Sequence, residues 1–154
     1  GTVTGSRIIG QRLAGPGYLH SRPSAAGNGY DAVNSNGSPL GQPTKPLLAR
    51  VNTDVARLHA ENPSQPVPVD LVTASASGLD PDITPAAAEF QVERIARDRG
   101  VSPEQVRQII QKYTSGRQLG FLGEPRVNVL EVNLALDKTM GSFARNSASV
   151  KPMF

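Results

Sequence analysis

Residues 66–85 constrain the fold most, because an apolar run, a glycine and a strong helix start follow one another within this stretch. The aliphatic residues of its first part favour a pleated segment: Val67, Val69, Leu71 and Val72. They predict a short strand at Val69–Thr73, followed by a loop that turns at Gly78. Thr84 precedes a proline, a pair that starts helices with the hydroxyl as N-cap and the proline at N1. The stretch is therefore predicted as a strand and a loop that run into a helix.

Residues 44–61 have the spacing of an amphipathic helix, with Thr44 as the cap and Asn62 and the proline after it as the stop. Apolar residues at i, i+3 and i+4 share one face of this helix: Leu47, Leu48, Val51, Val55 and Leu58.

Residues 85–99 are predicted as a second helix, closed by Gly100 as its C-cap. A capping box that begins at Ser102 opens a third helix, which ends at Gly116. The apolar residues expected on the inner faces of these two helices are Val92, Ile95, Val106, Ile109, Ile110 and Tyr113.

Residues 127–136 fit two patterns, because Val127 and Val129 alternate as in a strand while the wider apolar spacing fits a helix. Ten residues without glycine or proline, and Asn128 as a cap, favour the helix, which we predict.

The other segments have weaker signals. Residues 5–13 fit an edge strand, and residues 27–42 predict a long surface loop that Tyr30 and Leu40 attach to the body. Residues 118–126 predict a glycine-containing loop.

Together these elements predict an α+β fold, with three or four helices packed on a small sheet in a single domain over residues 1–140. Residues 141–154 have no apolar period and are predicted to be a disordered tail or a cloning remnant.

Composition excludes several classes of function. The chain of 154 residues has a net charge of +3 and a pI near 9.6, yet its arginines alternate with acidic residues along the helices, so we predict a solvated surface and no nucleic-acid partner. The absence of cysteine excludes disulfides, zinc thiolate sites and thiol catalysis. No apolar run approaches the ~20 residues of a spanning helix.

Catalytic and metal signatures are weak. Ser75 or Ser77 with His20 and Asp70 has the composition of a hydrolase triad, but neither serine lies in a nucleophile elbow, so acyl transfer is rejected. No phosphate-binding P-loop sequence occurs, which gives no support to independent ATP hydrolysis.

The oxygens of Asp80, Asp82 and Thr84 alternate as in a calcium loop, although the other ligands of that loop are missing. We therefore predict turn and helix-cap roles for these residues, and no metal site.

Three sequence blocks appear in a set order along the chain: Arg-Pro-Ser-Ala at 22–25, Val-Asp-Leu-Val-Thr-Ala-Ser-Ala-Ser-Gly-Leu-Asp-Pro at 69–81, and Leu-Gly-Glu-Pro-Arg-Val-Asn-Val-Leu at 122–130. In these blocks and their order the chain resembles the C subunit family of the bacterial Kdp potassium-transporting ATPase. The resemblance spans residues 5–139, and long literal blocks are far more specific than a short motif.

The resemblance implies a non-catalytic accessory subunit of an ATP-driven potassium uptake complex, which supports assembly and raises the ATP affinity of the catalytic subunit. It implies two partners, the catalytic ATPase subunit and a potassium-channel-like subunit, and no tightly bound cofactor, with ATP as the ligand expected in the assembled complex. It also implies a single membrane helix ahead of Gly1, so we expect a soluble fragment of a bacterial cell-membrane protein, with its domain outside the cytoplasm.

The candidate ligand-binding residues are Ser75, Ser77 and Gly78, which offer hydroxyls and a close backbone approach near a helix N-terminus. The candidates for an interface or family motif are Arg22, Ser24, Asp70, Thr73, Asp80, Gln91, Glu124, Arg126 and Asn128. Arg22 is expected to pair internally with the region of Asp70 or Glu124, and the alternative is a protein interface.

A second hypothesis from a different class is a small nucleotide-binding or hydrolytic domain that uses the Thr73–Asp80 loop together with Arg22.

Overall fold

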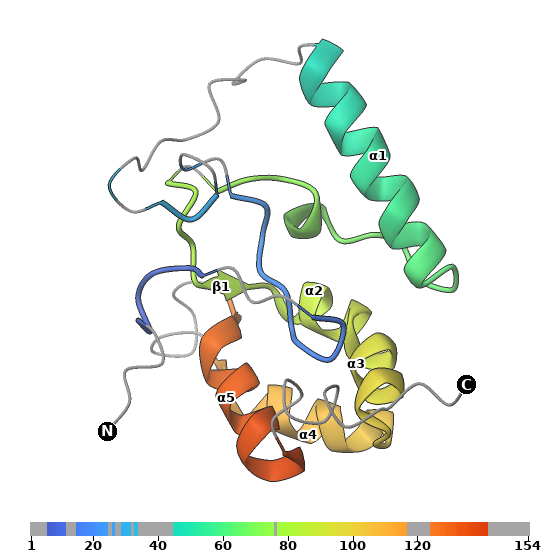
Figure 1. Ribbon diagram of the computed structural model, residues 1–154, viewed down its shortest axis with the longest axis vertical. Coiled ribbons are helices and arrows are strands. Elements are labelled where there is room, and N and C mark those ends of the chain that lie inside the picture. Colours follow the sequence, from blue (N-terminus) through green and yellow to red (C-terminus); the bar gives the residue numbers. More distant parts are fainter. Residues whose placement is uncertain are drawn as a thin grey trace, which may run out of the picture.

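The computed structural model describes residues 6–11, 15–24, 26, 29–31, 33, 45–75, 77–116 and 124–141. Its elements follow in the order α1 Lys45–Glu61, the 3-10 helix η1 Val69–Leu71, β1 Asp82–Ile83, α2 Pro85–Phe90, α3 Val92–Arg99, α4 Pro103–Lys112, β2 Thr114–Ser115, β3 Arg126–Asn128 and α5 Val129–Met140. The fold class is α+β, as predicted (Figure 1).

The sheet has three short antiparallel strands in the order β1-β3-β2. Ile83 of β1 and Thr114 of β2 lie opposite the same residue of the central strand, Val127. Val127 is fully buried, so the sheet contributes its apolar face to the core. The prediction of a strand at Val69–Thr73 is therefore wrong, because the strands come from other segments.

In place of that strand the chain makes the tight turn η1, in which Leu71 N–H donates to Pro68 and Val72 N–H donates to Val69. Leu71 and Val72 are both buried. A strand would point these two neighbours to opposite faces, whereas the turn directs both into one core. Hydrogen bonds within the turn then satisfy backbone groups that would otherwise need a neighbouring strand.

The described residues 6–11 form turns rather than the predicted edge strand. Gly10 N–H donates to Leu79 at 2.8 Å, and a Cβ on Gly10 would lie only 2.7 Å from the carbonyl oxygen of Asp80. The backbone of Gly10 therefore lies directly against the loop of residues 77–81. A pleated strand with a side chain at this position would clash with that loop.

The predicted single helix 85–99 is divided into α2 and α3 by Gln91. The start is as predicted, with Thr84 accepting from Ala87 N–H, and so is the end, with Gly100 in the left-handed conformation. Val92 and Ile95 are fully buried, as expected. The break lies at Gln91, whose side chain bonds to a distant segment of the chain, as described below.

The starts of the last two helices are confirmed. Ser102 and Gln105 form the complete capping box of α4, which ends at Lys112, earlier than predicted. Asn128 caps α5 by accepting from Glu131 N–H. Both patterns of residues 127–136 are realised, since Val127 belongs to β3 and the residues after the cap are helical. Arg126, predicted in a loop, begins β3.

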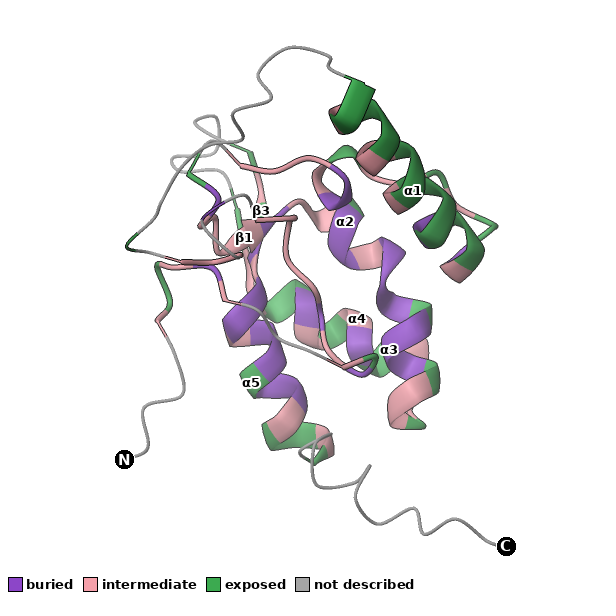
Figure 2. Cartoon of the chain, turned by 45° about the horizontal axis from the view of Figure 1, so that its top comes forward, coloured by how far each residue is buried: buried purple, intermediate pink, exposed green. Residues whose placement is uncertain are grey.

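Helix α1 begins at Lys45 and ends at Glu61, as its stop signal predicted. Figure 1 shows it lying apart from α4 and α5. Leu58 is the one buried residue of this fully described helix, while Leu48 is 50% exposed. The predicted apolar stripe is thus only partly covered, and Figure 2 shows the contrast with α2, α3 and α5.

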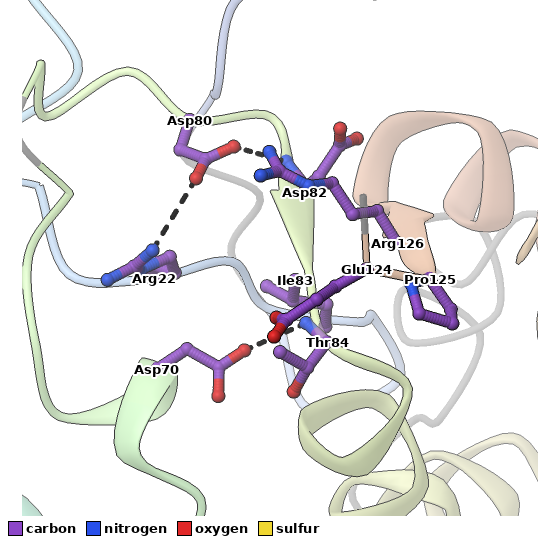
Figure 3. Close-up of a pocket in the computed structure, with 9 residues that line it drawn as sticks. All are labelled: Arg22, Asp70, Asp80, Asp82, Ile83, Thr84, Glu124, Pro125 and Arg126. Atoms are coloured by element: carbon purple, nitrogen blue, oxygen red, sulfur yellow. Dashed lines mark hydrogen bonds and ion pairs between the residues drawn. The ribbon is translucent and has the colours of Figure 1, made fainter. Parts of the chain in front are cut away.

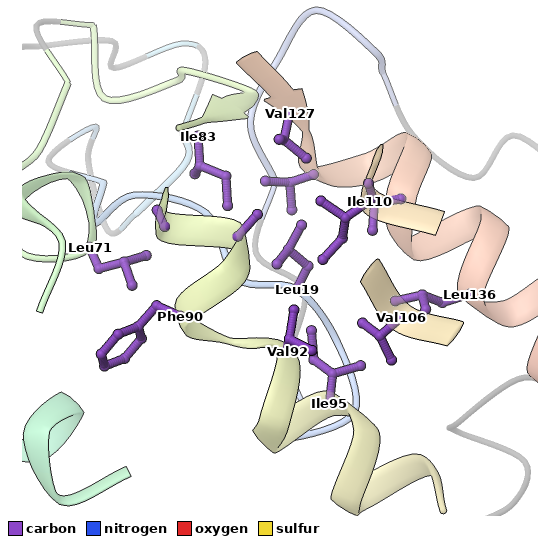
Figure 4. Close-up of a cluster of buried hydrophobic side chains, with 14 of the residues drawn as sticks. Leu19, Leu71, Ile83, Phe90, Val92, Ile95, Val106, Ile110, Val127 and Leu136 are labelled. Carbon is purple, nitrogen blue, oxygen red and sulfur yellow. The ribbon is translucent and has the colours of Figure 1, made fainter. Parts of the chain in front are cut away.

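The core lies between α2, α3, α4, α5 and the sheet (Figure 4). Its large buried side chains include Leu19, Leu71, Ile83, Phe90, Val92, Ile95, Val106, Ile110, Val127 and Leu136. Leu19 comes from an irregular segment near the N-terminus and is fully buried among helices that begin far along the chain.

Several predictions fall on residues outside the described ranges. They concern Thr44, Leu40, most of the loops 27–42 and 118–126, and all of the tail 141–154 except Gly141.

Candidate functional site

The three sequence blocks converge on one small depression, which we call the charged groove (Figure 3). Its lining residues are Arg22, Asp70, Asp80, Asp82, Ile83, Thr84, Glu124, Pro125 and Arg126. They come from the segment before α1, from η1, from the loop and strand around β1, and from the entry to β3. Five of the candidate residues predicted from sequence therefore share one site.

Arg22 is held at the groove by the block that follows η1. Its Nη1 lies 3.5 Å from Asp80 Oδ2, its Nη2 donates to Thr73 Oγ1 at 3.3 Å, and its Nε donates to the Thr73 carbonyl. Arg22 therefore pairs internally, as expected, but its partners are Asp80 and Thr73 rather than Asp70 or Glu124 themselves. Asp70 is engaged elsewhere, because its Oδ2 accepts from Thr84 N–H at 2.8 Å at the start of α2.

Ser24 ties the first block to the glycine loop. Its hydroxyl donates to the carbonyl of Gly78 at 2.6 Å and accepts from Tyr30 N–H at 2.7 Å. Tyr30 also bonds through its hydroxyl to the carbonyl of Arg22, which confirms that Tyr30 attaches its loop to the body. Gly78 N–H donates to the Ser75 carbonyl, and Ser77 Oγ accepts from Leu79 N–H.

Gly78 has φ +68°, the left-handed conformation expected for the turn, and it is buried. We expect Gly78→Val to lower the free energy of unfolding by about 1–3 kcal/mol, because a β-branched residue is strained at this angle. Urea denaturation followed by circular dichroism measures it. Gly116→Val is the control, since a Cβ on Gly116 meets no atom of the structure within 4 Å. Equal stability of the two variants would contradict the assignment of Gly78 as a turn residue that needs the left-handed conformation.

The turn and cap roles predicted from sequence are confirmed for Asp80 and for Thr84, the cap of α2, but not for Asp82, which lies in strand β1. Asp80 Oδ1 accepts from Asp82 N–H at 3.1 Å, and Asp82 Oδ1 accepts from Asn128 Nδ2 at 3.0 Å. Asn128 also donates to the Arg7 carbonyl and so joins β1, β3 and the N-terminal segment. Among the described residues, no group of three histidine or acidic side chains is arranged to hold a metal ion.

The rim of the groove carries two uncommitted charges. Glu124 and Arg126 form no ion pair with any described residue, and both are exposed. Four carboxylates face two guanidinium groups, so the net charge of the groove is −2. Its volume is about 110 Å³, below the 300–1,000 Å³ usual for small-molecule sites.

Gln91 lies away from the groove, in a second polar cluster beneath segment 15–22. Its amide makes four hydrogen bonds: Oε1 accepts from His20 N–H and from Arg94 Nη2, while Nε2 donates to the carbonyls of His20 and Ala87. Asn133 of α5 holds Leu19 in the same way, by accepting from its N–H and donating to its carbonyl, both at 2.8 Å. Two side-chain amides thus replace the strand partner that this extended segment lacks.

Arg94 completes the cluster and connects it to α1. Its guanidinium donates to the carbonyls of Pro16 and Tyr18 and pairs with Glu61 at the end of α1. Burial lowers the pKa of Arg94, and the Glu61 carboxylate opposes that shift. A second buried arginine, Arg99, donates to the Gly17 carbonyl at 2.6 Å and pairs with Asp137 of α5.

His20 belongs to this cluster, and its Nε2 donates to the Gly15 carbonyl at 2.8 Å. Asp70 and Ser77 bond to other partners, so the triad considered from sequence is not linked by hydrogen bonds. Burial lowers the pKa of His20, and the positive charge of Arg94 lowers it further. The native structure therefore favours the neutral imidazole.

We expect the free energy of unfolding to fall as the pH drops from about 7 to about 5, because unfolded His20 takes up a proton at a higher pH than folded His20. The change His20→Gln removes this contribution, so the fall becomes smaller. Urea denaturation at both pH values measures it, with His59→Gln, an exposed position on α1, as the control. An unchanged fall in the His20→Gln variant would refute the expectation.

A family model described as KdpC, K+-transporting ATPase c chain, matches residues 1–138. The chain belongs to the KdpC family. Among its relatives, a potassium-transporting ATPase KdpC subunit of Koribacter versatilis is 62% identical over 139 residues, which cover 90% of this chain and 72% of the relative. The corresponding subunit of Rhodopseudomonas palustris strain BisB5 is 54% identical, over 90% of this chain and 75% of the relative.

The KdpC match includes all three blocks and every candidate site residue. A Caulobacter vibrioides relative of the same name is 54% identical over 137 residues, with 89% of this chain and 70% of the relative covered. No helix in the described part of the chain has the length and apolar character needed to cross a membrane.

Sequence reasoning missed the polar cluster beneath segment 15–22, apart from naming Gln91. Asn133 gave a signal in the sequence, because it is a polar residue within an apolar helix. In the structure it is 3% exposed. Arg94 and Arg99 gave none, because they belong to a helix whose charges alternate as on a solvated surface.

Proposed function

We propose that the chain is a non-catalytic accessory subunit of an ATP-driven potassium uptake complex and that it supports assembly of that complex. The observation that carries this proposal is membership of the KdpC family over residues 1–138, whose relatives bear the name of a potassium-transporting ATPase subunit. The partners proposed are the catalytic ATPase subunit and a potassium-channel-like subunit, at the bacterial cell membrane. The domain is placed outside the cytoplasm in this proposal, behind an N-terminal membrane helix.

The charged groove supports a protein-binding role. It is built from rigid elements, with Arg22, Asp70 and Asp80 each engaged by backbone or charged partners. Its rim presents the uncommitted side chains of Glu124 and Arg126 on the segment that enters β3. Partly exposed, preoriented charges of both signs suit a polar interface rim, where they set orientation and partner choice.

The nucleotide-binding alternative has less support. Phosphate-binding loops offer free backbone N–H groups, whereas those of Gly78 and Leu79 are already bonded within the loop. The net charge of the groove, −2, repels an anion, and its volume is small for a nucleotide. We accordingly propose that the chain binds no cofactor tightly and acts on ATP affinity through the catalytic subunit.

The test compares the membrane complex purified with and without this chain. We expect potassium-stimulated ATP hydrolysis and recovery of the other subunits to fall when the chain is omitted, and the apparent KM for ATP to rise where partial complexes remain. The chain alone is expected to hydrolyse no ATP above background. Undiminished assembly and activity without the chain would overturn the proposal.

A second measurement distinguishes the nucleotide-binding alternative from the accessory-subunit proposal. ATP is titrated into the isolated chain while amide resonances of Ser75, Ser77 and Gly78 are followed by NMR. We expect no saturable shift at sub-millimolar ATP. Saturation in that range, lost in a Ser77→Ala variant, would favour the nucleotide-binding hypothesis.

A further inference from the structure

Residues 6–11, which we call the N-terminal strap, lie against the loop that carries the acidic side of the charged groove. Gly10 is buried, and its N–H donates to the carbonyl of Leu79 at 2.8 Å. A Cβ on Gly10 would lie 2.7 Å from the carbonyl oxygen of Asp80, well inside the ~3.5 Å at which non-bonded heavy atoms normally touch. A side chain at this position would therefore displace the loop of residues 77–81.

Asp80 is in contact with both the strap and the groove. Its backbone carbonyl meets Gly10, while its carboxylate lies 3.5 Å from Nη1 of Arg22 in the groove (Figure 3). An ion pair of this length is close to the ~4 Å limit beyond which two charged groups are no longer paired. A small shift of Asp80 therefore alters the pairing of Arg22.

A second link joins the strap to the next acidic residue of the groove. The side-chain amide of Asn128 donates to the carbonyl of Arg7 at 3.1 Å and to Oδ1 of Asp82 at 3.0 Å. The oxygen of the same side chain caps α5 by accepting from Glu131 N–H. One amide thus fixes Asp82, the strap and the start of α5 relative to one another.

Further contacts hold the strap between these two links. Arg7 pairs with Glu131 at 2.8 Å, although a pair whose arginine side chain is 71% exposed stabilises the strap only weakly. Ile9 is half-buried, and the hollow that it lines with Pro81 and Leu130 has a volume of about 10 Å³, no more than a single water molecule needs. The strap is therefore packed closely onto the wall of the groove.

The strap contributes little to the hydrophobic core. Ile8 is 80% exposed, and none of the residues 6–11, all of which are described, belongs to the core cluster. Its contacts are instead concentrated on the residues that carry the acidic side of the groove. We therefore expect a change in the strap to alter the groove more than the stability of the domain.

We propose that the N-terminal strap is a positioning element of the charged groove, and that it holds Asp80 and Asp82 where a partner subunit binds them. This inference rests on the proposed function, in which the groove is a protein-binding surface. Gly10 and Asn128 are its positioning residues, since neither lines the groove and each fixes one of these two acidic residues. By linkage, a partner bound in the groove also stabilises the docked strap.

The first test follows the groove by NMR in the 154-residue chain. Nε–H of Arg22 donates to the Thr73 carbonyl, so its side-chain signal reports the geometry of the groove. We expect this signal to shift in the Gly10→Ala variant and to stay in place in Gly116→Ala, where a Cβ meets no atom of the structure within 4 Å. An unchanged Arg22 signal in the Gly10→Ala variant would refute the inference.

The second test removes the other link while keeping the helix cap. Asn128→Ser and Asn128→Asp both retain a side-chain oxygen that can cap α5, and both lose the amide that joins Arg7 to Asp82. We expect each variant to fold, as judged by circular dichroism, and to bind the remaining subunits of the complex about tenfold more weakly. Unchanged affinity of both variants would contradict the inference. So would weaker binding of the Asn128→Asp variant alone, because the added negative charge beside Asp82 would then explain it.

A double-variant cycle separates a positioning role from a direct contact between the strap and the partner. Affinity for the remaining subunits is measured for Gly10→Ala, for Arg22→Gln and for the two changes together. If Gly10 acts through the groove, its change weakens binding by a smaller factor in the Arg22→Gln background than in the native chain. Equal factors in the two backgrounds would overturn the inference and leave the proposed function standing, since purification of the complex without the chain tests that function separately.

Discussion

Replacing Gln91 by leucine is expected to lower the free energy of unfolding by about 3–5 kcal/mol. Gln91 is 2% exposed and its amide satisfies four groups. Leucine has a similar volume but leaves the partly buried backbone N–H and carbonyl of His20 without the partners they have in Gln91. Each such orphan costs about 1–3 kcal/mol, and a domain of this size has only about 5–15 kcal/mol in total.

Urea denaturation of the 154-residue chain, followed by circular dichroism, measures the change. The matched control is Gln111→Leu, the same substitution at an exposed position of α4, which should alter stability by less than about 0.5 kcal/mol. If the two variants unfold at the same urea concentration, the amide of Gln91 does not have the role assigned to it.

Replacing Arg94 by methionine is expected to cost about 3–5 kcal/mol, because one partner of a largely buried ion pair is removed while the other remains. Glu61 would lose its partner, and the carbonyls of Pro16 and Tyr18 would lose their donor. Since Glu61 lies at the end of α1, hydrogen exchange should also accelerate in that helix more than in α5.

Arg97→Met is the control, as Arg97 lies on the same helix with its side chain 66% exposed. Unaltered stability of the Arg94→Met variant, or exchange that accelerates equally everywhere, would contradict the prediction. Arg94 and Gln91 share a hydrogen bond. The loss of unfolding free energy in the double variant should therefore be smaller than the sum of the losses in the two single variants.

Local signals in the sequence predicted the helix ends well. The caps at Thr84, Ser102 and Asn128, and the left-handed Gly100, depend on residues within one turn of each other. The strands were not predictable in the same way. Each has two or three residues, and their pairing depends on tertiary packing around Val127.

The division between α2 and α3 shows a second limit. Its cause is the bonding of Gln91 with His20, which is 71 residues away in sequence. Nothing near residue 91 predicts that contact. The charged groove was partly predictable, since the blocks that form it were recognised together, but the pairing of Arg22 with Asp80 depends on the turn η1 that replaced the expected strand.

The way segment 15–22 is held also has a consequence for how the protein is made. Tyr18 and Leu19 find native partners in Asp137 and Asn133, which are 119 and 114 residues later in the chain. During synthesis these bonds cannot form until α5 has left the ribosome, so a segment that emerges before every described helix is among the last to reach its final place. Closing so long a loop is slow, and Leu19 stays exposed to other chains and to chaperones throughout that interval.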